Sequence, residues 1–312
     1  MKIRIGTRGS ALALWQSRHI ADRLAGVFVD LDVAVVEISS DGDRMADVPL
    51  SHVEGTGFFT AALERALLLG DIDAAVHSYK DLPVESSPEL MVAAVPPRGP
   101  VEDVLCARDG LTLETLPVGA RVGTCSTRRT AQIRLVRDDL EIVPVRGNVP
   151  TRLARVGGDL DAVVLARAGL VRLGLDDAIT ETFPIDRMLP APAQGALALQ
   201  CRALDAAVRQ RLRALNDEAS MRAVEAERGM LHALGGGCAV PVGAFASPSA
   251  GGFTMVAGVF GLRSRRTVRT RVSGGDPVSL GRLAAARLLG GGAAAILSEI
   301  DAEAGAVLGL SS

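Results

Sequence analysis

Cys238 follows three consecutive glycines in the segment LGGGCAVPVG, residues 234–243. One interpretation is a small side chain packed in a tight turn. The other is a reactive thiol, because successive free backbone amides favour the thiolate and the missing Cβ atoms leave room for a large substituent. The local sequence leaves both interpretations open.

Asp81 adjoins Lys80 in the segment HSYKDLP, residues 77–83, directly after an apolar stretch that predicts a buried strand. Lys80 and Lys2 are the only lysines in the chain. A carboxylate in a cleft lined by arginines can stabilise a cationic intermediate or handle a proton. The alternative is structural: an aspartate that caps a helix beside a surface lysine.

Arginines and hydroxyl side chains recur at three predicted strand-to-helix turns, in GTRGSALALWQ (6–16), VGTCSTRRTAQIR (122–134) and VRGNVPTR (145–152). Such turns attract anions, and an arginine fork pairs with a carboxylate. Any one of these arginines is explained equally well as a solvated surface charge. Their recurrence at equivalent turns predicts a ligand with several carboxylates. The candidates are Arg8, Ser10, Thr124, Ser126, Arg128, Arg129, Arg146 and Arg152.

The elements that must position these residues alternate between strand and helix. Helices are predicted at 10–25, with Ser10 as N-cap, at 58–70, near Ser126 and after the RGNVP segment. This alternation favours an α/β fold with a mostly parallel sheet covered on both faces. Strands are predicted at 2–6, 31–39, 72–76, 120–124, 141–145 and 160–166.

Two clusters of prolines and glycines, VPPRGP at 95–100 and LPAPAQG at 189–195, flank a self-contained α/β segment. They predict a second lobe inserted in the first, with a hinge and a cleft between the lobes. A long amphipathic helix at 217–234 and strands at 253–262 and 266–272 predict a small α+β domain that follows. The expected domains are 1–96 with 194–214, then 100–190, then 217–312.

Composition excludes several classes of function. The formal net charge of −2 over 312 residues gives no general attraction to nucleic acid or to anionic membranes. We see no secretory signal and no apolar run long enough to span a membrane. The four cysteines are far apart and neither they nor the four histidines have the spacing of metal ligands. We therefore expect a cytoplasmic protein with reduced thiols and no metal.

Six segments together resemble one enzyme family. TRGSALALWQ, HSYKDLP, VGTCSTRR, RGNVPTR, QGALALQCR and GGGCAVPVG follow the order and spacing found in hydroxymethylbilane synthase, also called porphobilinogen deaminase. The resemblance covers nearly the whole chain. It implies two lobes like those of periplasmic solute-binding proteins, the second inserted in the first, and a third domain whose Cys238 carries a dipyrromethane cofactor through a thioether.

The resemblance also implies the reaction and the roles of residues. Four porphobilinogen units are added head to tail to the cofactor, each with loss of ammonia, and the linear tetrapyrrole hydroxymethylbilane is then hydrolysed off. Asp81 would stabilise the cationic azafulvene formed when ammonia leaves. Gln194 would lie near the site at the second crossover, and the enzyme would be a monomer. The residues expected to bind cofactor and substrate carboxylates are Arg8, Ser10, Lys80, Thr124, Ser126, Arg128, Arg129, Arg146, Arg152 and Arg172.

The chain departs from the family pattern at four positions. Thr56 stands where lysine is frequent, Pro150 where glycine is usual, Gln200 where glutamate is common and Cys125 where serine is usual. These changes bear on the carboxylate contacts more than on the reaction. Two other functions stay open on the residues alone: a non-catalytic two-lobed solute-binding module, and a transferase that uses Cys238 as a turnover nucleophile.

Overall fold

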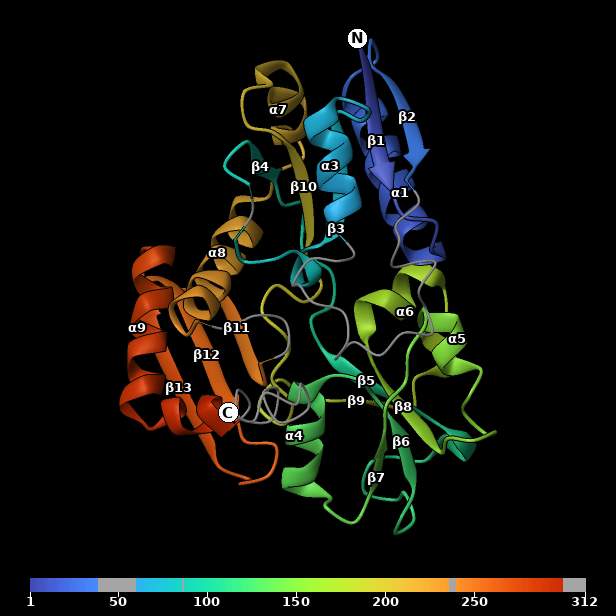
Figure 1. Ribbon diagram of the computed structural model, residues 1–312, viewed down its shortest axis with the longest axis vertical. Coiled ribbons are helices and arrows are strands. Elements are labelled where there is room, and N and C mark those ends of the chain that lie inside the picture. The colour runs from blue at the N-terminus through green and yellow to red at the C-terminus, as the bar shows by residue number, and fades with distance from the viewer. Residues whose placement is uncertain (39–59, 86, 236–239, 300–312) are drawn as a thin grey trace, which may run out of the picture.

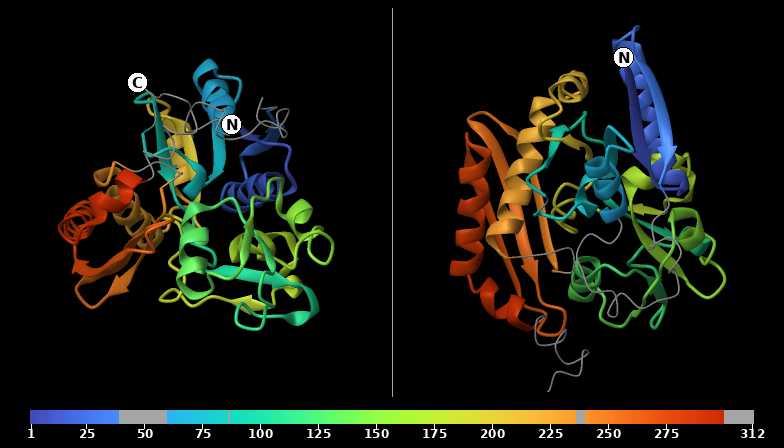
Figure 2. Two further views of the ribbon diagram at one scale, coloured as in Figure 1. Left: turned by 60° about the horizontal axis from the view of Figure 1, so that its bottom comes forward. Right: turned by 45° about the horizontal axis from the view of Figure 1, so that its top comes forward.

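The computed structural model describes residues 1–38, 60–85, 87–235 and 240–299. Two α/β lobes lie one above the other, and a third domain lies beside them (Figures 1 and 2). Two of the positions singled out from the sequence, Thr56 and Cys238, are outside the described residues.

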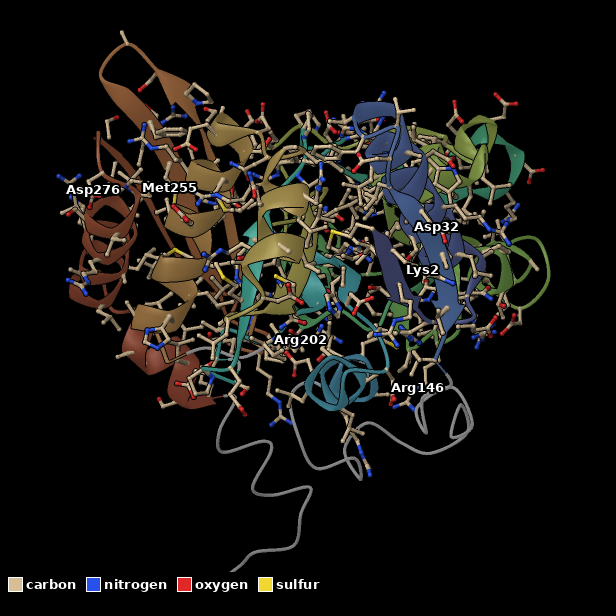
Figure 3. All side chains as sticks on the ribbon, turned by 90° about the horizontal axis from the view of Figure 1, so that it is seen from above. Lys2, Asp32, Arg146, Arg202, Met255 and Asp276 are labelled. Carbon is tan, nitrogen blue, oxygen red and sulfur yellow. The ribbon has the colours of Figure 1, made fainter. Side chains whose placement is uncertain are left out.

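The first lobe is a five-stranded sheet with the order β2-β1-β3-β10-β4. Strands β1 and β2 run parallel, with Lys2 opposite Asp32 (Figure 3), and β10 runs antiparallel to both of its neighbours. The strands are β1 (Lys2–Thr7), β2 (Asp32–Glu37), β3 (Ala74–Ser78), β4 (Leu90–Ala94) and β10 (Leu197–Arg202). The helices are α1 (Ala11–Val27), α3 (Ala61–Leu69) and α7 (Ala206–Arg213), with a 3₁₀ turn, η2, at Tyr79–Asp81.

Local sequence signals explain the ends of the helices in this lobe. Ser10 is the N-cap of α1, as predicted, and its side chain accepts a hydrogen bond from the Ala13 amide. Gly70 ends α3 in the left-handed conformation, with φ of 77°. The side of α1 that carries Ile20 and Leu24 is buried against the sheet in the apolar core.

The second lobe repeats the design, with the sheet order β7-β6-β8-β5-β9. Its strands are β5 (Asp103–Ala107), β6 (Arg121–Gly123), β7 (Glu141–Val143), β8 (Ala162–Ala166) and β9 (Glu181–Thr182). Its helices are α4 (Thr127–Val136), α5 (Val149–Leu153) and α6 (Arg167–Leu173), and two 3₁₀ turns lie at Arg108–Gly110 and Asp176–Ala178.

The prediction of mostly parallel sheets is wrong. Each lobe sheet contains two parallel and two antiparallel strand pairs in the described residues. The physical reason is the pair of crossovers. Strand β5 enters the second lobe from β4, and β10 returns from it to the first, so each lies antiparallel in the middle of a sheet rather than following a helix.

The third domain is a three-stranded antiparallel sheet in which β11 (Val242–Ser249), β12 (Gly252–Phe260) and β13 (Thr267–Gly274) are adjacent. Helices α8 (Glu218–Ala233) and α9 (Pro277–Gly290) pack on each other and on the sheet. The core between them includes Met230, Leu288 and Met255, the last of which is labelled in Figure 3. The fold class is therefore confirmed, although strand β11 was not predicted.

Among the described residues, no single helix has the length and apolar composition needed to cross a membrane. The bent pair Pro277–Gly290 and Ala293–Glu299 reaches that length and composition only when its two members are taken together.

Candidate active site

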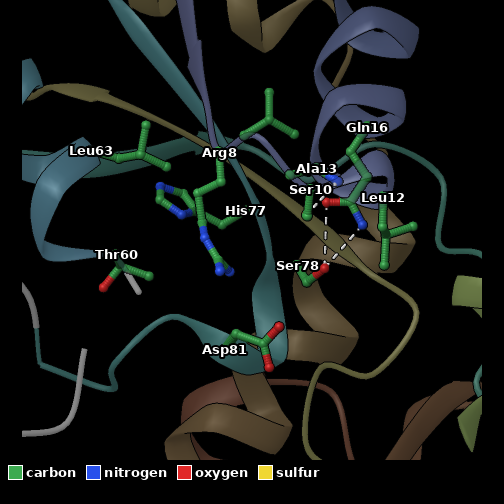
Figure 4. A pocket seen from close by; sticks show the side chains of 11 residues that line it. Arg8, Ser10, Leu12, Ala13, Gln16, Thr60, Leu63, His77, Ser78 and Asp81 are labelled. Atoms are coloured by element: carbon green, nitrogen blue, oxygen red, sulfur yellow. Dashed lines mark hydrogen bonds between the residues drawn. The ribbon is translucent and has the colours of Figure 1, made fainter. Parts of the chain in front are cut away.

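Asp81 and Arg8 face the same small pocket of about 110 Å³ in the first lobe (Figure 4). Strand β3 ends at Ser78, and the 3₁₀ turn that follows presents the exposed Asp81 at the mouth of the pocket. The loop after β1 supplies Arg8 from the opposite wall, and Ser10 and Gln16 line the pocket from α1. The Gln16 amide donates to Ser78 Oγ at 3.0 Å. The pocket thus combines a cation, an anion and neutral donors.

Lys80 lies beside Asp81 and points toward the second crossover. Its Nζ donates to Gln194 Oε1 at 3.4 Å, and the buried Gln194 amide donates to Val101 O at 2.8 Å and to Asp103 Oδ1 at 2.9 Å. The pKa of Lys80 is lowered to about 8, chiefly by burial; the charges of Arg129 and Arg128 act in the same direction, while those of Asp81 and Asp103 oppose the shift. A carboxylate bound here would favour the charged form of this lysine.

Arg128 and Arg129 are both buried at the start of α4, where they share Asp103. Arg128 Nη1 donates to Asp103 Oδ2 at 2.6 Å, and Arg129 donates to Asp103 Oδ1 from Nε at 3.0 Å and from Nη2 at 2.7 Å. The remaining nitrogen of Arg129, Nη1, donates to Val164 O at 2.9 Å. Although burial opposes it, the two guanidinium groups hold the pKa of Asp103 well below its usual range. Arg129 therefore has a protein partner for each of its nitrogens, which the sequence did not reveal.

Thr124 and Ser126 lie on the turn between β6 and α4, where both hydroxyls have local roles. The Ser126 amide donates to Thr124 Oγ1 at 3.1 Å, and Ser126 Oγ accepts from the Arg129 amide at 3.4 Å as the N-cap of α4. Between them, the exposed Cys125 donates from Sγ to Val145 O at 2.9 Å. The thiol therefore lies on the same turn as two predicted site residues.

Arg146 lies on the turn between β7 and α5 and is labelled in Figure 3, and Arg152 lies within α5. Arg152 Nε donates to Gly147 O at 2.8 Å, at a glycine whose φ of 96° closes the turn. Burial and then the charge of Arg129 lower the pKa of Arg152, while Asp81 acts against them. Arg152 is in the second lobe and Asp81 in the first, so the two lobes bring these opposite charges within electrostatic range.

Pro150 costs this turn no hydrogen bond. It occupies the first turn of α5, after the N-cap Asn148, whose side chain accepts from the Thr151 amide at 2.9 Å. The first amides of a helix have no partner within the helix, so a proline is tolerated there. The departure from glycine is thus explained by helix geometry.

Arg172 lies apart from the Asp81 pocket. Its Nη2 donates to Gly195 O at the second crossover, at 2.6 Å, and its side chain lines a different pocket between α1 and α6. Burial alone lowers its pKa to about 10. The structure therefore gathers Arg8, Ser10 and Asp81 in one pocket, with Lys80 and Gln194 beside it. Arg172, from α6, lies instead in the separate pocket between α1 and α6. Cys238, the predicted point of cofactor attachment, lies outside the described residues.

Sequence reasoning did not predict the contacts of several buried polar residues that hold this site together. His77 and Gln200 are adjacent in the sheet: His77 Nε2 and Gln200 Oε1 are 3.0 Å apart, and Gln200 Nε2 donates to Glu64 Oε1 at 2.9 Å. Arg98 and Glu227 form a second buried pair. A signal was available for two of the charges: Arg98 lies within the breaker cluster VPPRGP, and Asp103 lies beside the apolar residues of VEDVL.

The family models and the curated relatives that match this chain all belong to one family. Residues 3–210 match the model for the dipyrromethane cofactor binding domain of porphobilinogen deaminase, and residues 221–290 match the model for its C-terminal domain. The porphobilinogen deaminase of Syntrophus aciditrophicus is 44% identical over 302 residues, which cover 96% of this chain and 99% of that protein. The enzyme of Mycolicibacterium gilvum is 51% identical over 78% of each chain.

Among solved structures, the methionine binding protein MetQ is similar with a TM-score of 0.46 and 14% identity, over 69% of this chain and 89% of that one. The two family models cover nearly all of both lobes and most of the third domain. The chain belongs to the porphobilinogen deaminase family.

Proposed function

We propose that this chain condenses four porphobilinogen molecules, with loss of ammonia at each step, on a dipyrromethane primer bound to Cys238, and then releases the linear tetrapyrrole by hydrolysis. The observation that carries the assignment of roles is the pocket in which Asp81 faces Arg8, with the half-buried Lys80 beside it. Family membership supports the reaction, and the arrangement of charges supports the roles of the residues.

The residues present fit a primer of this kind by the chemistry of their donors. Two pyrrole rings, each with an acetate and a propionate, need cationic and neutral donors on several sides. Lys80 supplies one cation from the first lobe and Arg152 another from the second, and the pKa of each is lowered by burial. Bound carboxylates would offset that cost. When bound, the primer supplies a nucleophilic α-carbon on its terminal ring.

Asp81 is the proposed catalytic group. Its carboxylate is exposed at the mouth of the pocket and stabilises positive charge on the porphobilinogen carbon as ammonia leaves. The same carboxylate is placed where it would also stabilise positive charge on a neighbouring pyrrole ring and accept its proton. Arg8, on the opposite wall, orients a substrate carboxylate so that the reacting carbon lies beside Asp81.

The other predicted residues take two kinds of role in this proposal. Arg146, on the turn between β7 and α5, and Arg152, within α5, bind carboxylates directly. Arg128 and Arg129 act indirectly: both donate to Asp103, which also accepts from Gln194 and so fixes the position of that side chain. Thr124 and Ser126 fix the turn that leads into α4.

Denaturing mass spectrometry of the purified chain tests the attachment. The expected result is a permanent adduct of two condensed pyrrole units, absent in Cys238→Ser and retained in Cys125→Ser, the matched change at the exposed thiol. The same samples are assayed for conversion of porphobilinogen to a product that cyclises to uroporphyrin. An unmodified but active enzyme would refute the primer, and an adduct seen only during turnover would favour a nucleophilic thiol.

We further propose that the chain works as a monomer in the cytoplasm, without nucleic acid or a membrane as partner. The formal net charge of −2 supports the lack of a polyanionic partner. Sedimentation of the active enzyme should give a single species of 32.4 kDa, and a dimer at assay concentrations would refute the proposal.

A further inference from the structure

A second pocket, with a volume of about 470 Å³, lies between α1 of the first lobe and α6 of the second. The residues of α1 that line it, among them Trp15, Arg18 and Asp22, recur at the spacing of one helix face. The residues that α1 contributes to the Asp81 pocket, Ala13 and Gln16 among them, lie on a different face of the same helix. The two pockets are therefore separate sites on either side of α1.

The chemistry of this second pocket is specific. Trp15 and His19 form a stacked pair, with ring centroids 4.9 Å apart and an angle of 10° between the rings. Arg18 lines the pocket from α1 and Arg172 from α6. In the described part of the chain neither arginine has an ion-pair partner within 4.0 Å, and Arg172 donates instead to the backbone carbonyl of Gly195. A flat ring surface flanked by two unneutralised guanidinium groups is suited to an aromatic dicarboxylate.

We propose that this pocket binds a pyrrole dicarboxylate of the size of porphobilinogen, at a site separate from the Asp81 pocket. The ring lies against Trp15 and His19, one carboxylate pairs with Arg18 and the other with Arg172. The choice of a pyrrole rests on the proposed function. Asp22 lines the same pocket and faces the aminomethyl group of the substrate. Because one arginine belongs to each lobe, the ligand holds α1 against α6 and braces one arrangement of the two lobes.

Trp15 is the only tryptophan in the chain, so its fluorescence reports on this pocket. The probe is the pyrrole that keeps the acetate and propionate of porphobilinogen but has hydrogen in place of the aminomethyl group, so that it cannot lose ammonia. Titrated into the wild-type holoenzyme, it should change the Trp15 emission and reach two equivalents bound per chain by calorimetry. In Arg18→Gln, the dissociation constant followed through Trp15 should rise roughly tenfold, as expected for loss of one charge-assisted hydrogen bond.

Two matched variants make the result decisive. Arg213→Gln removes an exposed arginine of α7, far from the pocket in sequence, and should bind like the wild type. Arg8→Gln weakens binding in the Asp81 pocket and should leave the Trp15 signal unchanged. A Trp15 signal that is lost in Arg8→Gln and kept in Arg18→Gln would overturn the proposal, as would a stoichiometry of one in the wild type. Failure of the proposed function is seen separately, as absence of product from porphobilinogen.

Discussion

Glu227 of the third domain and Arg98 of the first crossover form a buried bidentate ion pair. Arg98 Nη1 donates to Glu227 Oε1 at 2.7 Å and Nη2 donates to Oε2 at 3.0 Å. Glu227 also accepts from the amide of Ala193 on the second crossover at 2.6 Å and from that of Ala246 on β11 at 2.8 Å. One carboxylate thus joins both chain segments of the hinge to the third domain.

Removing one partner of this pair should destabilise the protein strongly. Arg98→Leu leaves a buried carboxylate without its cation, and the free energy of unfolding should fall by about 3–5 kcal/mol. The measurement is the midpoint of urea denaturation. The control is Arg155→Leu, which breaks the more exposed pair with Asp159 and should cost less than about 1 kcal/mol. Equal effects of the two changes would contradict the structural role given to Glu227.

Asp81→Asn tests the catalytic carboxylate. The amide keeps the size of the side chain but loses its charge, so kcat should fall roughly 10²–10³-fold, with a smaller change in KM. The cofactor adduct should persist in the mass spectrum, which separates lost catalysis from lost attachment. Asp71→Asn, at an exposed aspartate of the same lobe, should leave kcat unchanged. Retention of full activity by Asp81→Asn would refute the proposed role.

The lowered pKa of Lys80 predicts that substrate binding weakens at alkaline pH. Its pKa is lowered from 10.5 to about 8, mainly by burial, so the positive charge is lost as the pH rises through 8 and KM should rise there. Lys80→Arg keeps its charge to a much higher pH, and its KM should stay flat between about pH 8 and 10. An identical alkaline rise in wild type and Lys80→Arg would assign it to another group.

The lowered pKa of Lys80 weakens substrate binding at alkaline pH but raises the free energy of unfolding there. Between pH 8 and 10.5 the unfolded chain binds a proton at Lys80 that the native state does not, so this residue increases stability as the pH rises across that interval.

His77 predicts a loss of stability in acid. Burial lowers its pKa from 6.5 to about 4, although the contact with Gln200 opposes the shift. Between these values the unfolded state binds a proton that the native state does not, so stability falls as the pH drops from 6.5 to 4, by about 3 kcal/mol in total. His77→Gln should show a flatter pH dependence in urea denaturation. His232→Gln, at an exposed histidine, should retain the wild-type slope.

The sequence predicted the elements whose signals are local. Ser10 caps α1 as predicted, α4 begins directly after Ser126 where a helix start was predicted, and the two breaker clusters mark the crossovers between lobes. Strand β10 was missed because its place is decided by pairing with β3, more than 100 residues earlier, and not by its own periodicity. Local patterns carry no information on such long-range pairing.

The candidate site could likewise be predicted only in part, because local patterns do not reveal contacts between distant segments. The arginine-bearing segments do form strand-to-helix connections: Arg146 lies on the turn before α5, whereas Arg128 and Arg152 lie inside the helices that follow the turns. Their partners were not predictable: Asp103, which pairs with Arg128 and Arg129, is separated from them by 25 and 26 residues. Arg172 matched the family motif but projects into the α1–α6 pocket, because the direction of its side chain depends on how the lobes pack.

The position of β10 between β3 and β4 has a consequence for biosynthesis. The strands of the second lobe all lie between Asp103 and Thr182, so this lobe can close its sheet as soon as that stretch has left the ribosome. The first lobe begins earlier in the chain but has a gap in the middle of its sheet until residues 197–202 emerge. The lobe translated first is therefore completed after its insert, and a nascent chain halted when residues up to about 190 have emerged from the ribosome, but residues 197–202 have not, should resist protease over the insert while its amino-terminal portion is still digested.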